Sequence, residues 1–232
     1  MDVDGCALPE DRWYDLENDV WLQPTASDPS VARLGLVASL GSFAGRFRSL
    51  QFRPIADEIE RGRSLATVES TRYTGAVRAP TDATILERNP AVVAAPKLLN
   101  NDPYGEGWIA ALRMGNPDET GRRLLRAAEA AAPYRARIRE RRIRCYPAVP
   151  DVELYEIGLE CSAVLAQLDQ EIARIAPGEV VLLVTDDPTS PIEMVRWSDR
   201  TGHAVLGRRT EDQLEHFLVR READPKPRRP RS

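Results

Sequence analysis

The sequence predicts a β-rich N-terminal domain, a helical connector and a C-terminal α/β two-layer sandwich. From Trp13 to about Met114, short strand-like runs alternate with turn residues, which is typical of a β fold. An arginine-rich segment follows, and the prolines of Pro147-Ala148-Val149-Pro150 indicate a domain boundary. Beyond that boundary, strand and helix periodicities alternate in the order βαβαββ, which predicts two layers.

Length and composition narrow the class of protein. The chain has 232 residues, enough for two modest domains, and its net charge of −4 does not indicate binding to nucleic acid or to an anionic membrane. No apolar run approaches the length of a membrane span, and the acidic N-terminus does not resemble a secretory signal. Three cysteines, an odd number, predict no disulfide framework and favour a reducing, cytoplasmic setting.

The N-terminal part is expected to begin with a loose leader, residues 1–11, in which Cys6 is incidental. Turns are indicated at Gly41, Gly45, Arg61-Gly62, Gly75 and Asn89-Pro90. Many short strands at this spacing predict a compact β sandwich or barrel. The strand candidates are Trp13-Tyr14, Val20-Trp21-Leu22, Leu34–Val37, Phe47–Phe52, Leu65–Val68 and Ala83–Leu86.

A helix is predicted after this β region. Asn116 suits its N-cap, Pro117 its first position, and Glu119 stands three residues after the cap. Pro133 is expected to break or kink this helix.

The connector, residues 131–150, carries six arginines between Arg135 and Arg144 that point in several directions on a helix. They could line an inter-domain surface, bind an acidic partner or contact phosphate, and a solvated linker helix is the favoured interpretation. Cys145 is a secondary thiol, whose pKa the neighbouring positive charge would lower.

The C-terminal domain is predicted over residues 151–222, and residues 223–232 are predicted to be a disordered basic tail. His203 and His216 are too isolated for a metal site or a catalytic triad, so no metal is expected. The predicted elements are a strand at 152–157, a helix at 162–175, a strand at 180–185, a helix at about 191–200, and strands near 204–208 and 213–220.

Cys161 is the candidate catalytic residue, because it lies where a strand ends and a helix begins. The first amide N–H groups of a helix are unpaired and carry the positive end of its dipole. That environment favours the nucleophilic thiolate over the thiol. The alternative is that Cys161 is only a small buried hydrophobe.

The residues around Cys161 carry a resemblance. Gly158-Leu159-Glu160-Cys161 resembles the active-site strand end of TusA-like sulfurtransferases, in which Gly-Leu-x-Cys-Pro-x-Pro supplies a persulfide-carrying cysteine. The resemblance extends through Ala176-Pro177-Gly178-Glu179, Asp186-Asp187-Pro188 and Thr201-Gly202-His203. Ser162 and Val164 replace the two motif prolines, which makes the start of the helix less rigid.

A second resemblance covers residues 12–130. Lys97–Trp108, above all Asp102-Pro103-Tyr104-Gly105-Glu106-Gly107-Trp108, resembles the glycine cleavage H protein, and Val68-Glu69-Ser70-Thr71-Arg72 is similar to its carrier hairpin. The resemblance implies the barrel-sandwich hybrid fold of lipoyl and biotinyl domains. Arg72 stands where the family carries lipoate on a lysine, and a guanidinium is a poor acyl acceptor, so no lipoate is expected. Arg72 is then either a solvated turn residue, the favoured interpretation, or an anion contact.

Together the resemblances imply a sulfur-relay protein in which Cys161 carries persulfide sulfur to a partner thiol and the H-like domain serves for docking. Glu160, Asp186 and Asp187 would make the surroundings of Cys161 acidic. The expected partners are sulfur-donor or sulfur-acceptor proteins, such as rhodanese-like or heterodisulfide-reductase-like proteins, and neither nucleic acid nor a membrane. The alternative is a non-catalytic adaptor built from two degenerate carrier domains.

Overall fold

The computed structural model describes residues 1–226, which divide into two compact units at the Cys145–Tyr146 bond. The predicted basic tail, residues 223–232, lies mostly outside the described residues, since only 223–226 are described. Within the described part, no helix has both the length and the apolar composition needed to cross a lipid bilayer.

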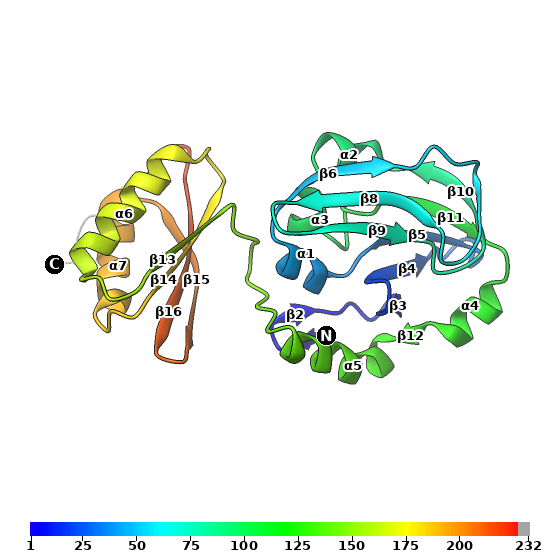
Figure 1. The fold of residues 1–232 in the computed structure, drawn as a ribbon, viewed down its shortest axis with the longest axis horizontal. Helices are drawn as coiled ribbons and strands as arrows, with labels where there is room; N and C mark the ends of the chain where they lie inside the picture. Colours follow the sequence, from blue (N-terminus) through cyan, green and yellow to red (C-terminus); the bar gives the residue numbers. More distant parts are fainter. Residues whose placement is uncertain (227–232) are drawn as a thin grey trace. The chain divides into compact units, whose positions relative to one another are not determined.

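The first unit is a sandwich of two antiparallel sheets (Figure 1). The larger sheet has the strand order β12-β3-β4-β5-β11-β10-β7, and the smaller one has the order β6-β8-β9. Large side chains such as Trp21, Leu34, Phe47 and Val68 are fully buried in one core, and each contributes roughly 1.5–3 kcal/mol relative to exposure. The strands are β3 (Trp13–Asp15), β4 (Val20–Pro24), β5 (Val31–Leu36), β6 (Phe47–Phe52), β7 (Glu58–Ile59), β8 (Ser64–Ser70), β9 (Thr74–Arg78), β10 (Ala83–Arg88), β11 (Ala110–Met114) and β12 (Leu125–Arg126).

All six strands predicted in this unit are present, and their two packed antiparallel sheets confirm the predicted barrel-sandwich fold. The sequence patterns missed β9 and β11, which pair with β8 and β10. Gly75 was predicted to lie in a turn and instead lies within β9. Three short helices connect the strands: α1 (Ala38–Ala44), α2 (Pro90–Ala94) and α3 (Leu98–Asn101).

The first eleven residues are folded, which corrects the prediction of a loose leader. They form a hairpin of β1 (Asp2–Val3) and β2 (Cys6–Ala7), and Val3, Cys6 and Leu8 are buried in the core. Asp4 and Gly5 adopt positive φ angles of 51° and 85°, as a tight two-residue hairpin turn requires. The apolar residues at alternate positions were too few to reveal a strand pattern.

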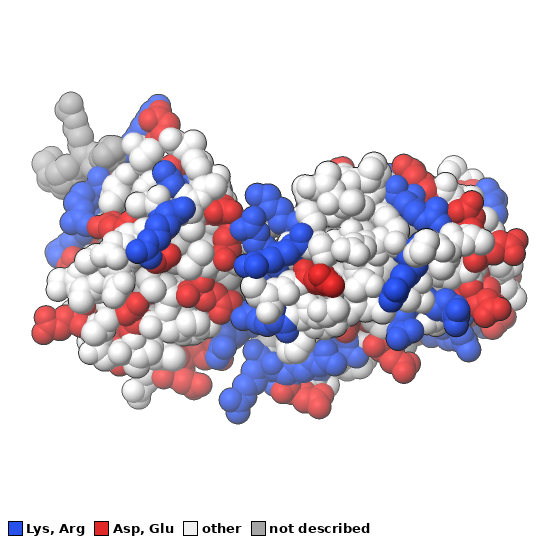
Figure 2. Space-filling view, turned by 45° about the horizontal axis from the view of Figure 1, so that its top comes forward, with Lys and Arg blue, Asp and Glu red and all other residues white. Residues whose placement is uncertain are grey.

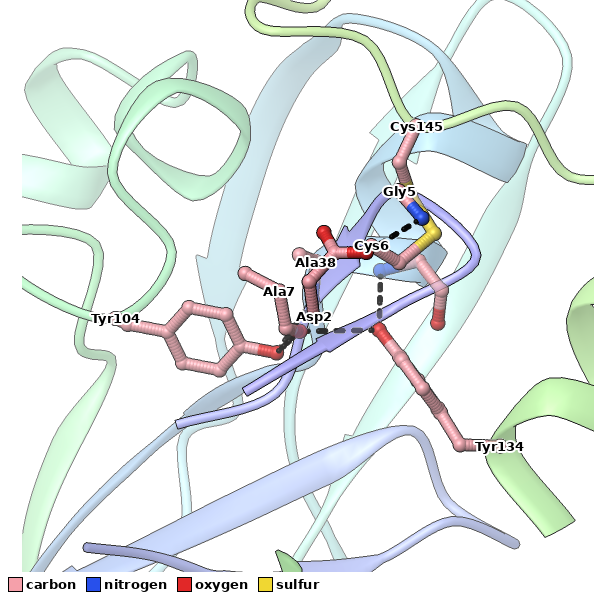
Figure 3. Close-up of a disulfide and its surroundings, with 9 residues drawn as sticks. Asp2, Gly5, Cys6, Ala7, Ala38, Tyr104, Tyr134 and Cys145 are labelled. Carbon is pink, nitrogen blue, oxygen red and sulfur yellow. Dashed lines mark hydrogen bonds between the residues drawn. A yellow bond between two sulfur atoms is a disulfide. The ribbon is translucent and has the colours of Figure 1, made fainter. Parts of the chain in front are cut away.

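Cys6 forms a disulfide with Cys145, which ends the first unit (Figure 3). The predictions that Cys6 is incidental, that Cys145 is a free secondary thiol and that no disulfide forms are therefore wrong. The two cysteines are separated by 139 positions, and only the fold brings them together.

Two tyrosine hydroxyls hold the hairpin against α1. Tyr104 and Tyr134 both donate hydrogen bonds to the carbonyl of Ala7, at 3.0 and 3.5 Å. The same hydroxyls accept the first N–H groups of α1, from Ala38 and Ser39, both at 3.1 Å. These bonds satisfy α1 donors that its own backbone leaves unpaired. Figure 3 shows both rings pointing toward the hairpin from different segments.

The helix predicted after Met114 exists as two helices, α4 (Pro117–Arg123) and α5 (Ala127–Glu140). Asn116 caps α4 by accepting the N–H of Glu119, as predicted. The interruption lies at Leu124–Arg126, where β12 pairs with β3, and not at Pro133, which lies inside α5. Burial of Ala130, Tyr134 and Ile138 against the core outweighs the hydrogen bond lost at the proline.

The arginine-rich segment is not a free connector, because most of it belongs to α5 on the surface of the first unit. Arg137 pairs with Asp19, and Arg139 contacts the carboxylate of Asp4 at 2.9 Å. Arg141 lies over the ring of Phe43, with its guanidinium carbon 5.4 Å from the ring centroid. These arginines bind the acidic and aromatic groups of their own domain, which corrects the interpretation as a solvated linker helix.

The second unit is a two-layer α/β sandwich, as predicted. Its four-stranded sheet has the order β13-β14-β16-β15, with β13 and β14 parallel and the other pairs antiparallel. Helices α6 and α7 cover one face of this sheet (Figure 1), and Leu168 and Trp197 are buried there. The elements are β13 (Val152–Glu156), α6 (Cys161–Arg174), β14 (Val180–Thr185), α7 (Ser190–Thr201), β15 (Ala204–Glu211) and β16 (Leu214–Arg220).

The other face of this sheet is also apolar, and the segment after Cys145 packs on it. Tyr146 and Ala148 contact a small cluster that includes Leu182 and Leu218. Tyr146 Oη lies 2.8 Å from Nδ1 of His216. The predicted connector therefore divides between the two units, since its residues from 146 onward form part of the second domain.

The disulfide gives a first prediction, on stability. Cys6→Ser should lower the free energy of unfolding of the first unit by about 2–5 kcal/mol, because a bond that closes so long a loop restricts the unfolded chain. Scanning calorimetry under oxidising conditions measures this loss. Cys161→Ser is the matched control and should leave the first unit unchanged. Equal stability of Cys6→Ser and the unmutated protein would contradict the structural role.

Candidate functional site

Cys161 is the first residue of α6, at the end of the loop that follows β13. The loop turns at Gly158, whose φ of 75° lies in the left-handed region that favours glycine. The N–H of Gly158 donates to Asp186 at 2.8 Å, which ties this loop to the loop after β14. The predicted strand–cysteine–helix arrangement is thus present, and parallel pairing of β13 with β14 brings both loops to the same sheet edge.

The helix begins at Cys161 without either motif proline. The N–H groups of Ala163 and Val164 donate to the carbonyl of Glu160 at 2.9 and 3.1 Å. Val164 is buried in the core of the second unit, whereas Ser162 is exposed. A proline would stabilise this first turn, and the packing of Val164 stabilises it instead. The thiol of Cys161 therefore keeps a defined position although Ser162 and Val164 replace the two prolines.

The loop after β14 and the start of α7 supply the polar neighbours of the thiol. Asp187 accepts the N–H and the hydroxyl of Thr189, at 2.7 and 2.6 Å, and also the backbone N–H of Cys161. These hydrogen bonds, first that from the Thr189 hydroxyl, lower the pKa of Asp187, so this carboxylate is negatively charged beside the thiol.

The pKa of Cys161 is raised, which corrects the expectation of a thiolate stabilised by the helix start. Burial is the largest cause, and the negative charges of Asp187 and Glu193 raise the pKa further. A hydrogen bond with Thr189 acts in the opposite direction. Cys161 is therefore a thiol at neutral pH, in partly exposed surroundings.

Glu160, Asp186 and Asp187 were predicted from the sequence to lie around Cys161, whereas Thr189 and Glu193, which also act on the thiol, were not. Thr189 follows Asp187 by two positions, a spacing typical of an Asp-capped turn. Glu193 lies in the first turn of α7, where acidic residues are common. Neither sequence pattern shows that these residues lie near Cys161, because they approach it only when α7 packs beside α6.

The predicted degenerate carrier position, Arg72, lies in the exposed turn between β8 and β9. Its guanidinium approaches the end of α1, where Gly45 has a φ of 75° and a Cβ would lie 3.2 Å from Arg72 Nε. The adjacent Tyr73 packs edge-on against Phe43 and Phe47. The arginine thus lies along its own domain, and no lysine occupies residues 70–74. This turn does not fit covalent attachment of lipoate.

The Lys97–Trp108 segment serves the fold and offers no reactive group. Asn100 accepts the N–H of Phe47 at 2.8 Å and donates to the carbonyl of Gly45 at 2.9 Å, which supports the turn beside Arg72. Asp102 accepts the N–H of Glu106 at 2.7 Å. Tyr104 provides the buried hydroxyl at α1, so the motif of this segment is explained by structure.

The two histidines have structural surroundings. His203 accepts the N–H of Glu222 at 3.1 Å and lies beside the ring of Trp197, and His216 is buried next to Tyr146. Across residues 1–226, no three His, Cys, Asp or Glu side chains are grouped to hold a metal ion. Charges of both signs are interspersed on the face seen in Figure 2.

Comparison with known proteins assigns each unit to a family. Residues 12–136 match the family model of the glycine cleavage H-protein, and residues 156–221 match that of the sulfurtransferase TusA. The two matches do not overlap and lie in the first and the second unit, respectively.

Glycine cleavage H proteins of other organisms are similar in sequence to the first unit. The chain is 34% identical to glycine cleavage system H protein 5 of Aquifex aeolicus over 148 residues, 62% of this chain and 98% of that protein. It is 32% identical to the probable glycine cleavage system H protein 2 of Sulfolobus acidocaldarius over 143 residues, 61% of this chain and 94% of that protein. A glycine cleavage system H protein structure from Mycobacterium marinum is 28% identical, with a TM-score of 0.46, and the match covers 55% of this chain and 98% of that one.

The site gives a second prediction, on thiol reactivity. Asp187→Asn keeps a side-chain oxygen that can accept the Thr189 hydrogen bonds, but it removes the negative charge. The pKa of Cys161 should therefore fall, and alkylation of Cys161 by iodoacetamide at pH 7 should become severalfold faster. In the unmutated protein the rate should rise about tenfold per pH unit until the thiol pKa is reached. Asp199→Asn, farther along α7, should change nothing. A rate already independent of pH near 7 would contradict the raised pKa.

Proposed function

The chain belongs to the glycine cleavage H-protein family and carries a TusA domain in its second unit, and from this premise we propose that it is a sulfur-relay protein. Cys161 accepts a sulfane sulfur and passes it to a partner thiol. The observation that carries the proposal is a partly exposed, unoxidised cysteine at the first position of α6, within the TusA match. The other two cysteines are bonded to each other, which leaves Cys161 as the nucleophile.

The transfer step needs no external oxidant or reductant. The Cys161 thiolate attacks the outer sulfur of a donor persulfide, a bond forms between Sγ and that sulfur, and the donor's S–S bond breaks. The electron pair leaves with the donor cysteine as a thiolate, and the proton stays on the transferred sulfur. The second transfer is the same step in which the partner's thiolate attacks the outer sulfur on Cys161.

The chain's own residues control how much thiolate is available for this step. Burial and the negative charges of Asp187 and Glu193 oppose the charge on Cys161, and the Thr189 hydroxyl donates its proton to Asp187 at 2.6 Å. Gly158 and Asp186 keep the loop before the cysteine in place through their hydrogen bond. The resulting thiol is protected from indiscriminate reaction at neutral pH, which suits a carrier that is loaded by a protein donor.

The partners in this proposal are sulfur-donor and sulfur-acceptor proteins, such as rhodanese-like donors and heterodisulfide-reductase-like acceptors. A cytoplasmic setting belongs to the same proposal, because Cys161 must stay reduced to act. Cys6 of the Cys6–Cys145 disulfide is completely buried, whereas Cys145 is partly exposed, so a reducing thiol would have to attack the bond at Cys145.

A non-catalytic adaptor is the second candidate, and two observations favour it. The carrier turn has Arg72 in place of a lysine, and acidic groups raise the pKa of the remaining thiol. In that case both units would retain only docking surfaces.

Sulfur loading distinguishes the two candidates. After incubation with a persulfide-loaded rhodanese, the intact mass should increase by one sulfur atom, because the donor supplies sulfane sulfur to Cys161. Cys161→Ser should abolish the increase, and Ser162→Ala, a change at the exposed neighbour, should retain it. If no donor adds sulfur to the unmutated chain, the adaptor is the better description.

We further propose that the chain carries no lipoate. Its intact mass should stay unchanged after co-expression with a lipoate ligase, because the exposed turn offers no primary amine. Arg72→Lys should restore an acceptor and allow modification. Arg78→Lys, at the end of β9 away from the turn, is the matched control and should remain unmodified. A lipoyl adduct on the unmutated protein would refute the proposal.

A further inference from the structure

The surface around Cys161 exposes large apolar side chains that the fold of the second unit does not use. Ile192 and Val195 are each 62% exposed and stand three positions apart on α7, opposite the buried Met194 and Trp197. In the loop directly before Cys161, Ile157 and Leu159 are 52% and 39% exposed. Apolar side chains gathered beside a reactive residue mark an interaction surface.

The charged groups that border these side chains are mainly acidic. Glu160 is exposed directly before Cys161, Asp186 is exposed on the loop after β14, and Glu193 stands between Ile192 and Val195 on α7. Glu193 pairs with Arg196 at 2.6 Å, and within residues 1–226 no ion pair is seen for Glu160 or Asp186. The charges that act on the sulfur itself, those of Asp187 and Glu193, are both negative.

We infer that this thiol-bearing surface, formed by Ile157, Leu159, Glu160, Asp186, Ile192 and Val195, docks a protein partner whose own cysteine lies on an apolar spot ringed by arginine or lysine. Charge complementarity selects such a partner, since an acidic partner would be repelled by the same carboxylates. The sulfur chemistry of this inference rests on the proposed relay. The docking surface itself rests on the exposure of the apolar side chains and on the charge of the carboxylates.

Docking of that kind would also activate the thiol. The carboxylates of Asp187 and Glu193 disfavour the Cys161 thiolate in the free protein, and arginines placed beside them would offset that negative charge. The thiolate would then form mainly in the complex, where a sulfur atom can be transferred. The free chain would react slowly with small thiol reagents, and the same acidic groups would provide both partner choice and protection.

The test uses the full chain and two synthetic peptides of matched length. Each peptide carries leucines and one cysteine as a thionitrobenzoate mixed disulfide, and the cysteine is flanked by arginines in one peptide and by glutamates in the other. The Cys161 thiolate attacks the peptide sulfur, a new disulfide forms, and thionitrobenzoate leaves with the electron pair and is measured by absorbance. Rates are normalised to those of the thionitrobenzoate mixed disulfide of N-acetylcysteine amide, which is neutral around its cysteine.

We expect the arginine peptide to react at least about tenfold faster at low salt, because opposite charges steer association. This preference should disappear at about 1 M salt, where charges are screened within ~3 Å. Glu160→Gln combined with Glu193→Gln should remove most of the preference. Glu171→Gln, about 15 Å farther along α6, should keep it. Ile192→Ala combined with Val195→Ala should slow exchange with the leucine-containing arginine peptide.

Equal rates for the two peptides at low salt would overturn the inference, and so would a preference that survives Glu160→Gln with Glu193→Gln. Sulfur loading of Cys161 is measured separately with the loaded rhodanese. Sulfur loading without a preference between the peptides would contradict the docking surface and support the relay. A preference for the arginine peptide without sulfur loading from any donor would support the docking surface and contradict the relay.

Discussion

The first unit depends on two tyrosine hydroxyls at the start of α1, those of the buried Tyr134 and the partly buried Tyr104. Tyr104 and Tyr134 come from distant segments, yet each accepts an α1 N–H and donates to the carbonyl of Ala7. Each such bond contributes only about 0.5–1.5 kcal/mol, but an unsatisfied buried group would cost roughly 1–3 kcal/mol. Burial raises the pKa of both tyrosines, so the hydroxyls remain neutral donors. These hydrogen bonds join the β1–β2 hairpin, α1 and the Lys97–Trp108 segment. The Cys6–Cys145 disulfide links the hairpin covalently to the last residue of the first unit.

In the second unit, two opposed effects decide the state of the thiol. The start of a helix favours an anion by roughly 0.3–1 kcal/mol at an exposed position. Partial burial of Cys161 and the charges of Asp187 and Glu193 act against it and raise the pKa of the thiol. The same carboxylates that suppress the free thiolate give the surface a charge that a basic partner can recognise. Low intrinsic reactivity and partner selection are therefore two consequences of one arrangement.

The two domains differ in what they retain from their families. The H-protein domain has a packed core and a β8–β9 hairpin, and the turn of that hairpin has Arg72 and no lysine in residues 70–74. The TusA domain keeps its cysteine at the start of a helix, and the buried Val164 replaces the rigidity of the missing proline. The free cysteine, Cys161, thus lies in the second unit, whereas both cysteines of the first unit are in a disulfide.

The sequence by itself determined the features that depend on local patterns. Strand and helix periodicities identified every described helix and strand of the second unit and six of the twelve strands of the first. Asn116 identified the start of α4, and the residues around Cys161 and Arg72 identified both candidate positions. These succeed because side-chain alternation and capping act within a few residues. Only the tertiary structure decided the Cys6–Cys145 pairing, the continuation of α5 through Pro133 and the raised pKa of Cys161. Each of these depends on groups that lie far apart in the chain and meet only when the core is packed.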